Sequence, residues 1–171
     1  MDKRSGCDAS LSRARAIRCL TWMLLLLPAA WLVACASGAE KRPLLVTSEN
    51  AAKLQNRQWE LKSLVVDGRE VVMDIQANMT LSFGSDGKVT GYAAINRFNG
   101  TCSFDQDGKL NWPSRGFVTT RKAGPPELME KERAYLEALP KTDRAILIGP
   151  ALRLQSEDES TTLMFVEPGK S

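Results

Sequence analysis

The feature that most constrains the fold is a series of short apolar segments separated by turn residues, which begins near Gln58. The segment 79–83 alternates strictly between apolar and polar residues, which predicts a strand with one buried face. The turn at Asp86-Gly87 then leads into a second segment, 88–93. Asp-Gly favours a β-hairpin because glycine readily adopts the positive φ that such turns require. By the same criteria, further strands are expected at 59–66, 101–105, 109–112, 117–121, 144–148, 151–155 and 162–166.

One segment departs from this pattern and predicts a helix. The sequence Pro125-Pro126-Glu127 suits a helix N-terminus, since proline is tolerated in the first turn and an acidic side chain favours the positive end of the helix dipole. Leu128, Tyr135 and Leu139 then share one face, and Pro140 ends the helix. The prediction is an α+β domain, mostly antiparallel β, with about eight or nine short strands in a barrel-like arrangement and one covering helix. Residues expected in its core include Trp59, Leu81, Phe83 and Leu136.

The first part of the chain has the layout of a secretory signal peptide, in which basic residues precede an apolar stretch. This stretch ends at Leu32-Val33-Ala34-Cys35, which resembles the lipobox of bacterial lipoprotein precursors. The resemblance implies that Cys35 is lipidated and, after cleavage, becomes the first residue of the mature protein. An uncleaved transmembrane anchor is the alternative, because the charge-free stretch 19–39 is long enough to span a bilayer, for which about 20 apolar residues suffice. Against the anchor, Pro28 interrupts this stretch.

Removal of residues 1–34 changes the charge balance of the chain. The whole sequence has 23 Lys and Arg against 20 Asp and Glu, and the leader holds five and two of these, so 23 − 5 and 20 − 2 leave 18 of each. A domain with no net charge lacks the basic surface that nucleic acid binding requires, so no nucleic acid partner is expected. The expected organisation is a signal peptide at 1–34, the lipidated cysteine and a flexible tether at 35–54, and one domain at 55–168. A short helical turn is expected at 48–55.

The composition also excludes several chemistries. The chain has no histidine, which excludes Ser-His-Asp and Cys-His catalysis and histidine-ligated zinc. Cys102 is the only cysteine after Cys35, so the mature chain is not expected to form an internal disulfide. Without a histidine to activate its thiol, Cys102 is interpreted as a small buried hydrophobe. No catalytic residue, metal or cofactor is expected.

The segment Gly91–Gly100 resembles the signature of the META domain, or HslJ-like, family. Neighbouring motifs occur in the order found in that family, with Trp59-Glu60-Leu61 before the segment and Thr120-Arg121 and Leu163-Met164-Phe165 after it. The resemblance covers about Gln58 to Glu167. It implies an envelope or secreted β-rich domain with one helix, associated with stress response and antibiotic tolerance and without an assigned enzymatic activity.

Two positions depart together from the pattern of this family. Family members commonly have one cysteine where this chain has Ile95 and another where it has Gly124. The resemblance implies that the family's two cysteines form a bridge that this chain lacks. If so, Ile95 and Gly124 should lie close together.

One group of residues near the signature is a candidate ligand or partner site: Asn96, Arg97, Phe98, Asn99, Thr120 and Arg121. Residues 96–100 are expected to form a loop between two strands. Where this loop meets Thr120-Arg121, an arginine and amide side chains would suit an anionic or carbohydrate-like ligand. The alternative is structural, with Asn and Gly supplying left-handed conformations and side-chain hydrogen bonds to the backbone while the phenylalanine packs.

The lipobox and family resemblances together imply a non-enzymatic lipoprotein of the bacterial cell envelope, which supports envelope integrity or stress and antibiotic tolerance by binding an envelope protein or a small ligand. The membrane contact is the lipid on Cys35. Ala36 stands where an aspartate signals retention at the inner membrane in some bacteria, so the periplasmic face of the outer membrane is expected. The alternative is a periplasmic inhibitor of a wall-degrading hydrolase or protease, acting through a rigid loop at 96–101 or 121–126. An enzyme built on paired carboxylates ranks last because no such pair can be placed.

Overall fold

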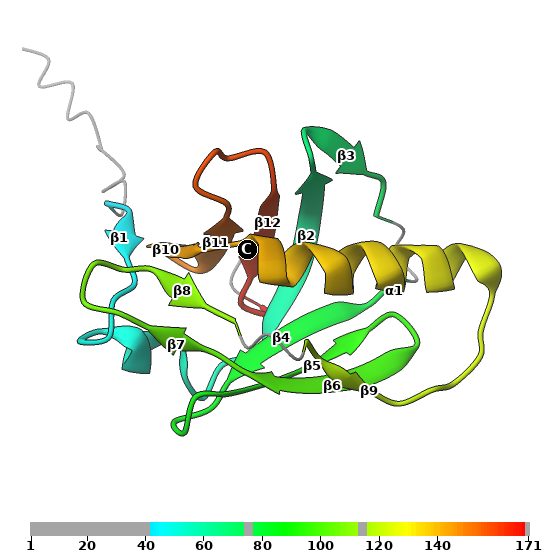
Figure 1. Cartoon of the computed structure of the whole chain (residues 1–171), viewed down its shortest axis with the longest axis horizontal. Helices are drawn as coiled ribbons and strands as arrows, with labels where there is room; N and C mark the ends of the chain where they lie inside the picture. The colour runs from blue at the N-terminus through cyan, green and yellow to red at the C-terminus, as the bar shows by residue number, and fades with distance from the viewer. Residues whose placement is uncertain (1–41, 74–76, 113–115, 170–171) are drawn as a thin grey trace, which may run out of the picture. The chain divides into compact units, whose positions relative to one another are not determined.

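The computed structural model describes residues 42–73, 77–112 and 116–169. In this part of the chain, ten strands form one sheet in the order β1-β10-β11-β12-β2-β4-β5-β6-β9, with β3 paired to β2, and β7 and β8 form a separate hairpin (Figure 1). The strands are β1 (Leu44–Leu45), β2 (Trp59–Val66), β3 (Arg69–Val71), β4 (Met79–Phe83), β5 (Lys88–Ala93), β6 (Asn96–Thr101), β7 (Ser103–Phe104), β8 (Leu110–Asn111), β9 (Val118–Thr119), β10 (Arg144–Ile148), β11 (Ala151–Gln155) and β12 (Thr162–Val166). The helical segments are η1 (Ala51–Leu54), α1 (Pro126–Ala138) and η2 (Leu139–Lys141).

The predicted fold class is confirmed, since the described residues form a mostly antiparallel β structure with one α-helix. The sheet is not closed, so the barrel-like arrangement that was expected is only a loose description of it. The β7–β8 hairpin lies beside β10. Leu110 N–H donates to Asp143 O at 2.6 Å, and the backbones of Lys109 and Arg144 form an isolated antiparallel β-bridge. The described residues hold more strands than the eight or nine expected, because strands of two or three residues are too short to show a periodic pattern.

The helix α1 crosses the sheet (Figure 1) and inserts Tyr135 into the core. The ring of Tyr135 lies 5.8 Å from that of Phe98 in β6 and 6.3 Å from that of Phe165 in β12. Its hydroxyl donates to Thr80 O in β4 at 3.1 Å, so one side chain contacts three strands. Burial raises the pKa of Tyr135 well above its ordinary value. Three of the expected core residues, Trp59, Leu81 and Phe83, are buried, whereas Leu136 is half-buried against the core.

The expected tether is too long by about ten residues. Leu44 pairs with Leu147 as β1 joins β10, and Val46 and Leu54 are completely buried. The expected helical turn is present as η1, which Trp59 fixes by donating its indole N–H to Leu54 O at 3.3 Å. Three consecutive apolar residues after Pro43 are therefore part of the folded domain; they were missed because so short a run resembles a linker. The expected signal peptide and Cys35 lie outside the described residues.

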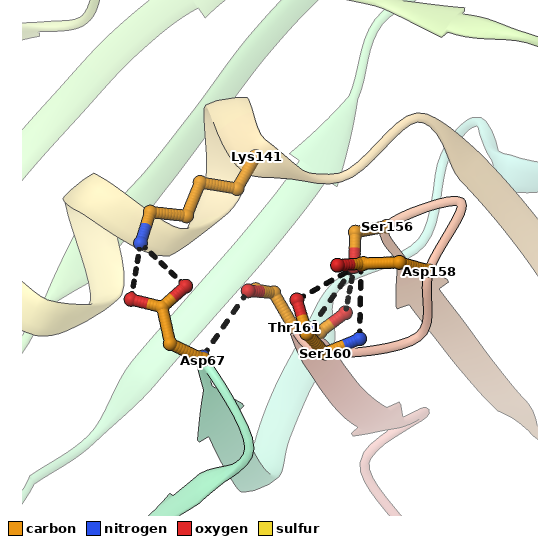
Figure 2. Close-up of polar contacts among 6 residues, drawn as sticks. All are labelled: Asp67, Lys141, Ser156, Asp158, Ser160 and Thr161. Atoms are coloured by element: carbon orange, nitrogen blue, oxygen red, sulfur yellow. Dashed lines mark hydrogen bonds and ion pairs between the residues drawn. The ribbon is translucent and has the colours of Figure 1, made fainter.

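A set of polar contacts joins the β2–β3 turn, the β11–β12 loop and η2 (Figure 2). Lys141 Nζ lies 2.8 Å from Asp67 Oδ2, while the Asp67 N–H donates to Thr161 Oγ1 at 3.5 Å. Asp158 accepts hydrogen bonds from Ser156 Oγ at 2.6 Å and from Ser160 N at 3.1 Å. Asp158 is exposed. Its pKa is lowered by hydrogen bonds, of which the bond from the Ser156 hydroxyl has the largest effect and those from Ser160 come next. In the described part of the chain, no helix is long and apolar enough to cross a membrane.

Candidate functional site

The expected loop at 96–100 is in fact the strand β6, so this prediction was wrong. The chain turns at Ala94 and Ile95, since Ala93 pairs directly with Asn96, and Ala94 adopts the left-handed conformation at φ 62°. Along β6, Asn96 and Phe98 are buried whereas Arg97 and Asn99 are exposed. The strand was not recognised because a polar asparagine occupies a buried position, which hides the alternation of apolar and polar residues.

The Asn96 side chain is the centre of a buried hydrogen-bond network. Its Nδ2 donates to Glu132 Oε1 at 2.8 Å and to Lys122 O at 3.2 Å. Its Oδ1 accepts from Thr120 Oγ1 at 2.9 Å and from Lys122 N at 2.8 Å. The Asn96 backbone N–H donates to Glu132 Oε2 at 2.9 Å. The amide thus makes four hydrogen bonds, which is the full capacity of an asparagine side chain.

This network holds α1 against the sheet. Asn96 is 3% exposed and Glu132 is 9% exposed, and a buried carboxylate is tolerated only when hydrogen bonds satisfy its oxygens. The network therefore fixes β6, the segment after β9 and the helix relative to one another. Glu132 was not among the residues predicted from the sequence. A signal was present, because this glutamate lies at i+4 from Leu128 and i−3 from Tyr135, on the predicted apolar face of the helix.

The six candidate residues do not form one site. Phe98 packs its ring 5.1 Å from that of Phe117 and serves the core, which matches the structural alternative. Thr120 N donates to Arg97 O at 3.0 Å, so the backbones of these two segments are adjacent. The Arg97 and Asn99 side chains, however, point to the opposite face of β6 from Asn96, because successive side chains along a strand alternate. Arg121 is exposed.

A groove of about 830 Å³ lies between α1 and β9, the last strand of the sheet. Apolar side chains from both walls line it, with Phe117 before β9, Met129 and Leu136 on the helix and Pro140 at one end. Met129, near the start of the helix, is 42% exposed, which is high for a large apolar side chain. The remaining lining residues are Gly116, Thr119, Gly124, Pro126, Glu130, Glu132, Arg133 and Glu137.

The charged side chains of the groove are exposed and unengaged. Glu130, Arg133 and Glu137 follow one another at spacings of three and four residues, which places them on the same side of α1. Among the described residues, none of these three side chains makes a hydrogen bond or an ion pair. Glu132 also lines the groove, but its two oxygens are occupied by Asn96. The groove thus combines an apolar floor with charges that are free to meet a ligand.

Ile95 and Gly124 are neighbours, as the family resemblance implied. A Cβ placed on Gly124 would lie 3.0 Å from Ile95 Cγ1 and 3.3 Å from Cγ2. Both of these atoms are bonded to Ile95 Cβ, so the two Cβ positions are separated by roughly the distance found in disulfides, about 3.5–4.5 Å. The Ile95 side chain packs directly against Gly124.

Two other kinds of chemistry concern the Cys102 thiol and metal binding. Burial raises the pKa of the Cys102 thiol to about 12, so the thiol stays protonated at neutral pH and is a poor nucleophile. This agrees with its interpretation as a small hydrophobe. The part of the chain that the structure describes holds no group of three His, Cys, Asp or Glu residues arranged to bind a metal ion.

These features define a small α+β domain in which one helix crosses an open antiparallel sheet beside a groove. The META domain family matches residues 52–169, so the chain belongs to the META domain family. A protein from Burkholderia xenovorans, solved by NMR, is similar to this chain at 25% identity and a TM-score of 0.58, over 75% of this chain and 93% of its own. A DUF4847 family protein from Bacteroides vulgatus shares the fold at 16% identity and a TM-score of 0.52, over 71% and 99%. No curated protein matches the sequence.

Proposed function

We propose that this chain is a lipid-anchored protein of the bacterial cell envelope whose META domain acts by binding rather than by catalysis. Its binding supports envelope integrity or tolerance to stress and antibiotics. The segment Leu32-Val33-Ala34-Cys35 supports the lipid anchor on Cys35. Ala36 favours the periplasmic face of the outer membrane. The association of the family with stress tolerance supports the physiological role.

The groove between α1 and β9 is the observation that carries the binding role. An exposed apolar patch rimmed by polar residues is typical of a binding site, and covering it with a ligand contributes about 25 cal/mol per Å² of apolar area removed from water. The groove volume, about 830 Å³, lies within the range of ligand sites, which is roughly 300–1,000 Å³. A few polar groups beside an apolar floor provide specificity in such sites, and Glu130, Arg133 and Glu137 are placed to do so.

The groove chemistry favours binding over catalysis. The most buried carboxylate beside it, Glu132, accepts a hydrogen bond from Asn96 on each of its oxygens, which gives it a role in holding the helix to the sheet. Glu130 and Glu137 lie on the exposed side of the helix, without the burial that tunes a general acid or base. These arrangements suit recognition of a ligand.

The test is complementation of a strain that lacks the gene, with antibiotic tolerance as the readout. Met129→Asp places a charge on the groove floor and should abolish complementation while the protein remains folded and labelled with fatty acid. Cys35→Ser should abolish fatty acid labelling and membrane sedimentation. Glu127→Gln is the matched control, because this exposed glutamate lies on the same helix but does not line the groove. Full complementation by Met129→Asp contradicts the binding role, and unchanged labelling of Cys35→Ser contradicts the anchor.

A further inference from the structure

We propose that the groove binds an extended polypeptide segment of a partner protein, which adds as a strand to β9 and places a cationic side chain beside Glu130 and Glu137. The inference rests on the proposed function, in which this groove is the binding site. Three observations carry it: the open edge of β9, the length of the groove and the charge of its rim.

The edge strand provides backbone groups for a partner strand. β9 ends the sheet and, in the described part of the chain, pairs with β6 alone. Thr120 N donates to Arg97 O, so these two residues form a hydrogen-bonded pair at the end of the β6–β9 ladder. In an antiparallel ladder, the residue next to a hydrogen-bonded pair directs its N–H and C=O away from the neighbouring strand. The backbone of Thr119 therefore points away from β6, towards the position a further strand would occupy. Strand addition at a free sheet edge is a common mode of peptide binding.

The groove has the length of a short extended segment. Its helical wall runs from Pro126 to Pro140, which corresponds to about 21 Å at 1.5 Å per residue. An extended chain covers this distance with about six residues at roughly 3.3 Å each. Alternate side chains of such a segment would face Phe117, Met129 and Leu136, which supply apolar contacts along the floor. A compact ligand would use only part of this surface.

The rim charges specify a cation on the partner. Glu130 and Glu137 carry two negative charges, and Arg133 between them carries one positive charge, so the exposed rim has one uncompensated negative charge. One lysine or arginine on the bound segment compensates it, whereas an acidic side chain at that place is repelled. Repulsion of the wrong partner contributes to specificity as much as attraction of the right one. The partner segment is thus apolar at alternate positions and basic at one of them.

The test measures the affinity of the full chain in detergent micelles for the peptide Thr-Leu-Thr-Lys-Thr-Leu-amide, labelled with fluorescein at its amino terminus, by fluorescence polarisation. Replacement of the lysine by glutamate in the peptide should weaken binding about tenfold, in line with the cost of placing like charges together. The double variant Glu130→Lys/Glu137→Lys should reverse this preference, while Glu127→Gln should leave it unchanged. N-methylation of the peptide amides that face β9 should abolish binding, and methylation of the alternate amides should not.

Several outcomes overturn the inference. Equal affinity for the lysine and glutamate peptides, or binding that is insensitive to N-methylation at every amide, would identify an apolar site without strand addition. Concentration-dependent self-association that Met129→Asp abolishes, with no peptide binding, would assign the groove to a second copy of this chain. Loss of complementation by Met129→Asp without any peptide binding would leave the proposed function standing and remove this inference alone.

Discussion

The two faces of α1 use polar residues in opposite ways. On the face towards the sheet, Glu132 is buried with both oxygens bound to Asn96, and the Tyr135 hydroxyl is bound to Thr80. On the groove face, Glu130 and Glu137 are exposed and unengaged in the described structure. The comparison indicates that one helix divides its roles, since its buried face holds the fold while its groove face is left free for recognition.

The largest loss of stability is expected for Glu132→Ala. The change leaves the backbone N–H and the side-chain amide of Asn96 without these acceptors in a buried site, and unsatisfied buried donors are costly. The free energy of unfolding should fall by about 3 kcal/mol, measured by urea denaturation. Glu130→Ala on the groove face is the matched control and should change it by no more than about 0.5 kcal/mol. Equal effects of the two variants would remove the distinction between the faces.

A gain of similar size is expected from Ile95→Cys/Gly124→Cys, made together with Cys102→Ala to prevent mispairing. The new bridge closes a loop of 124 − 95 = 29 residue steps, and the chain-entropy model gives a contribution of about 3–4 kcal/mol. The unfolding midpoint should rise under oxidising conditions compared with the reduced double variant. Thiols that stay free under oxidising conditions would show that the neighbouring Cβ positions are misplaced.

A smaller loss is expected for Tyr135→Phe, which removes the hydrogen bond to Thr80 O but keeps the ring packing. The free energy of unfolding should fall by about 1 kcal/mol at neutral pH. Because burial raises the folded-state pKa of Tyr135 above its ordinary value of 10.0, the wild type should lose stability as the pH rises above 10. Tyr135→Phe should lack this alkaline component. An identical pH profile in both proteins would contradict the burial of the hydroxyl.

The smallest effect is expected for Asp158→Asn in the exposed network of Figure 2. Hydrogen bonds from Ser156 and Ser160 lower the folded-state pKa of Asp158, so its contribution is present above its ordinary pKa of 3.8 and is lost as the pH falls through the folded-state value. The difference between variant and wild type, followed by thermal unfolding, should therefore shrink as the solution becomes acidic. Glu157→Gln in the same loop serves as the control. A difference that grows in acid would contradict the assignment.

The fold was largely predictable from the sequence because strand periodicity and Asp-Gly turns are local signals. The positions of Trp59, Leu81 and Phe83 in the core followed from this periodicity. Strands β1 and β9 were harder to predict, because a two-residue strand depends on a partner distant in the chain rather than on its own pattern. The expected strand at 117–121 was thus found only as Val118–Thr119.

The candidate site was predictable only in part. The sequence placed Asn96 and Thr120 in one candidate group, and in the structure their side chains share a hydrogen bond. It did not identify the groove, because a groove forms between elements and its residues, from Phe117 to Pro140, share no motif. Nor did it identify Glu132, since a glutamate on a helix is ordinarily exposed and its burial depends on the asparagine opposite.

The division between the two faces of α1 is tested most directly by Met129→Asp, with the thermal midpoint and the affinity for the lysine peptide measured on the same preparation. Met129 is exposed on the groove face, so the midpoint should stay within about 2 °C of wild type while the peptide binds at least about tenfold more weakly. A midpoint that falls as far as that of Glu132→Ala, or an unchanged affinity, would contradict the assignment of recognition to the groove face.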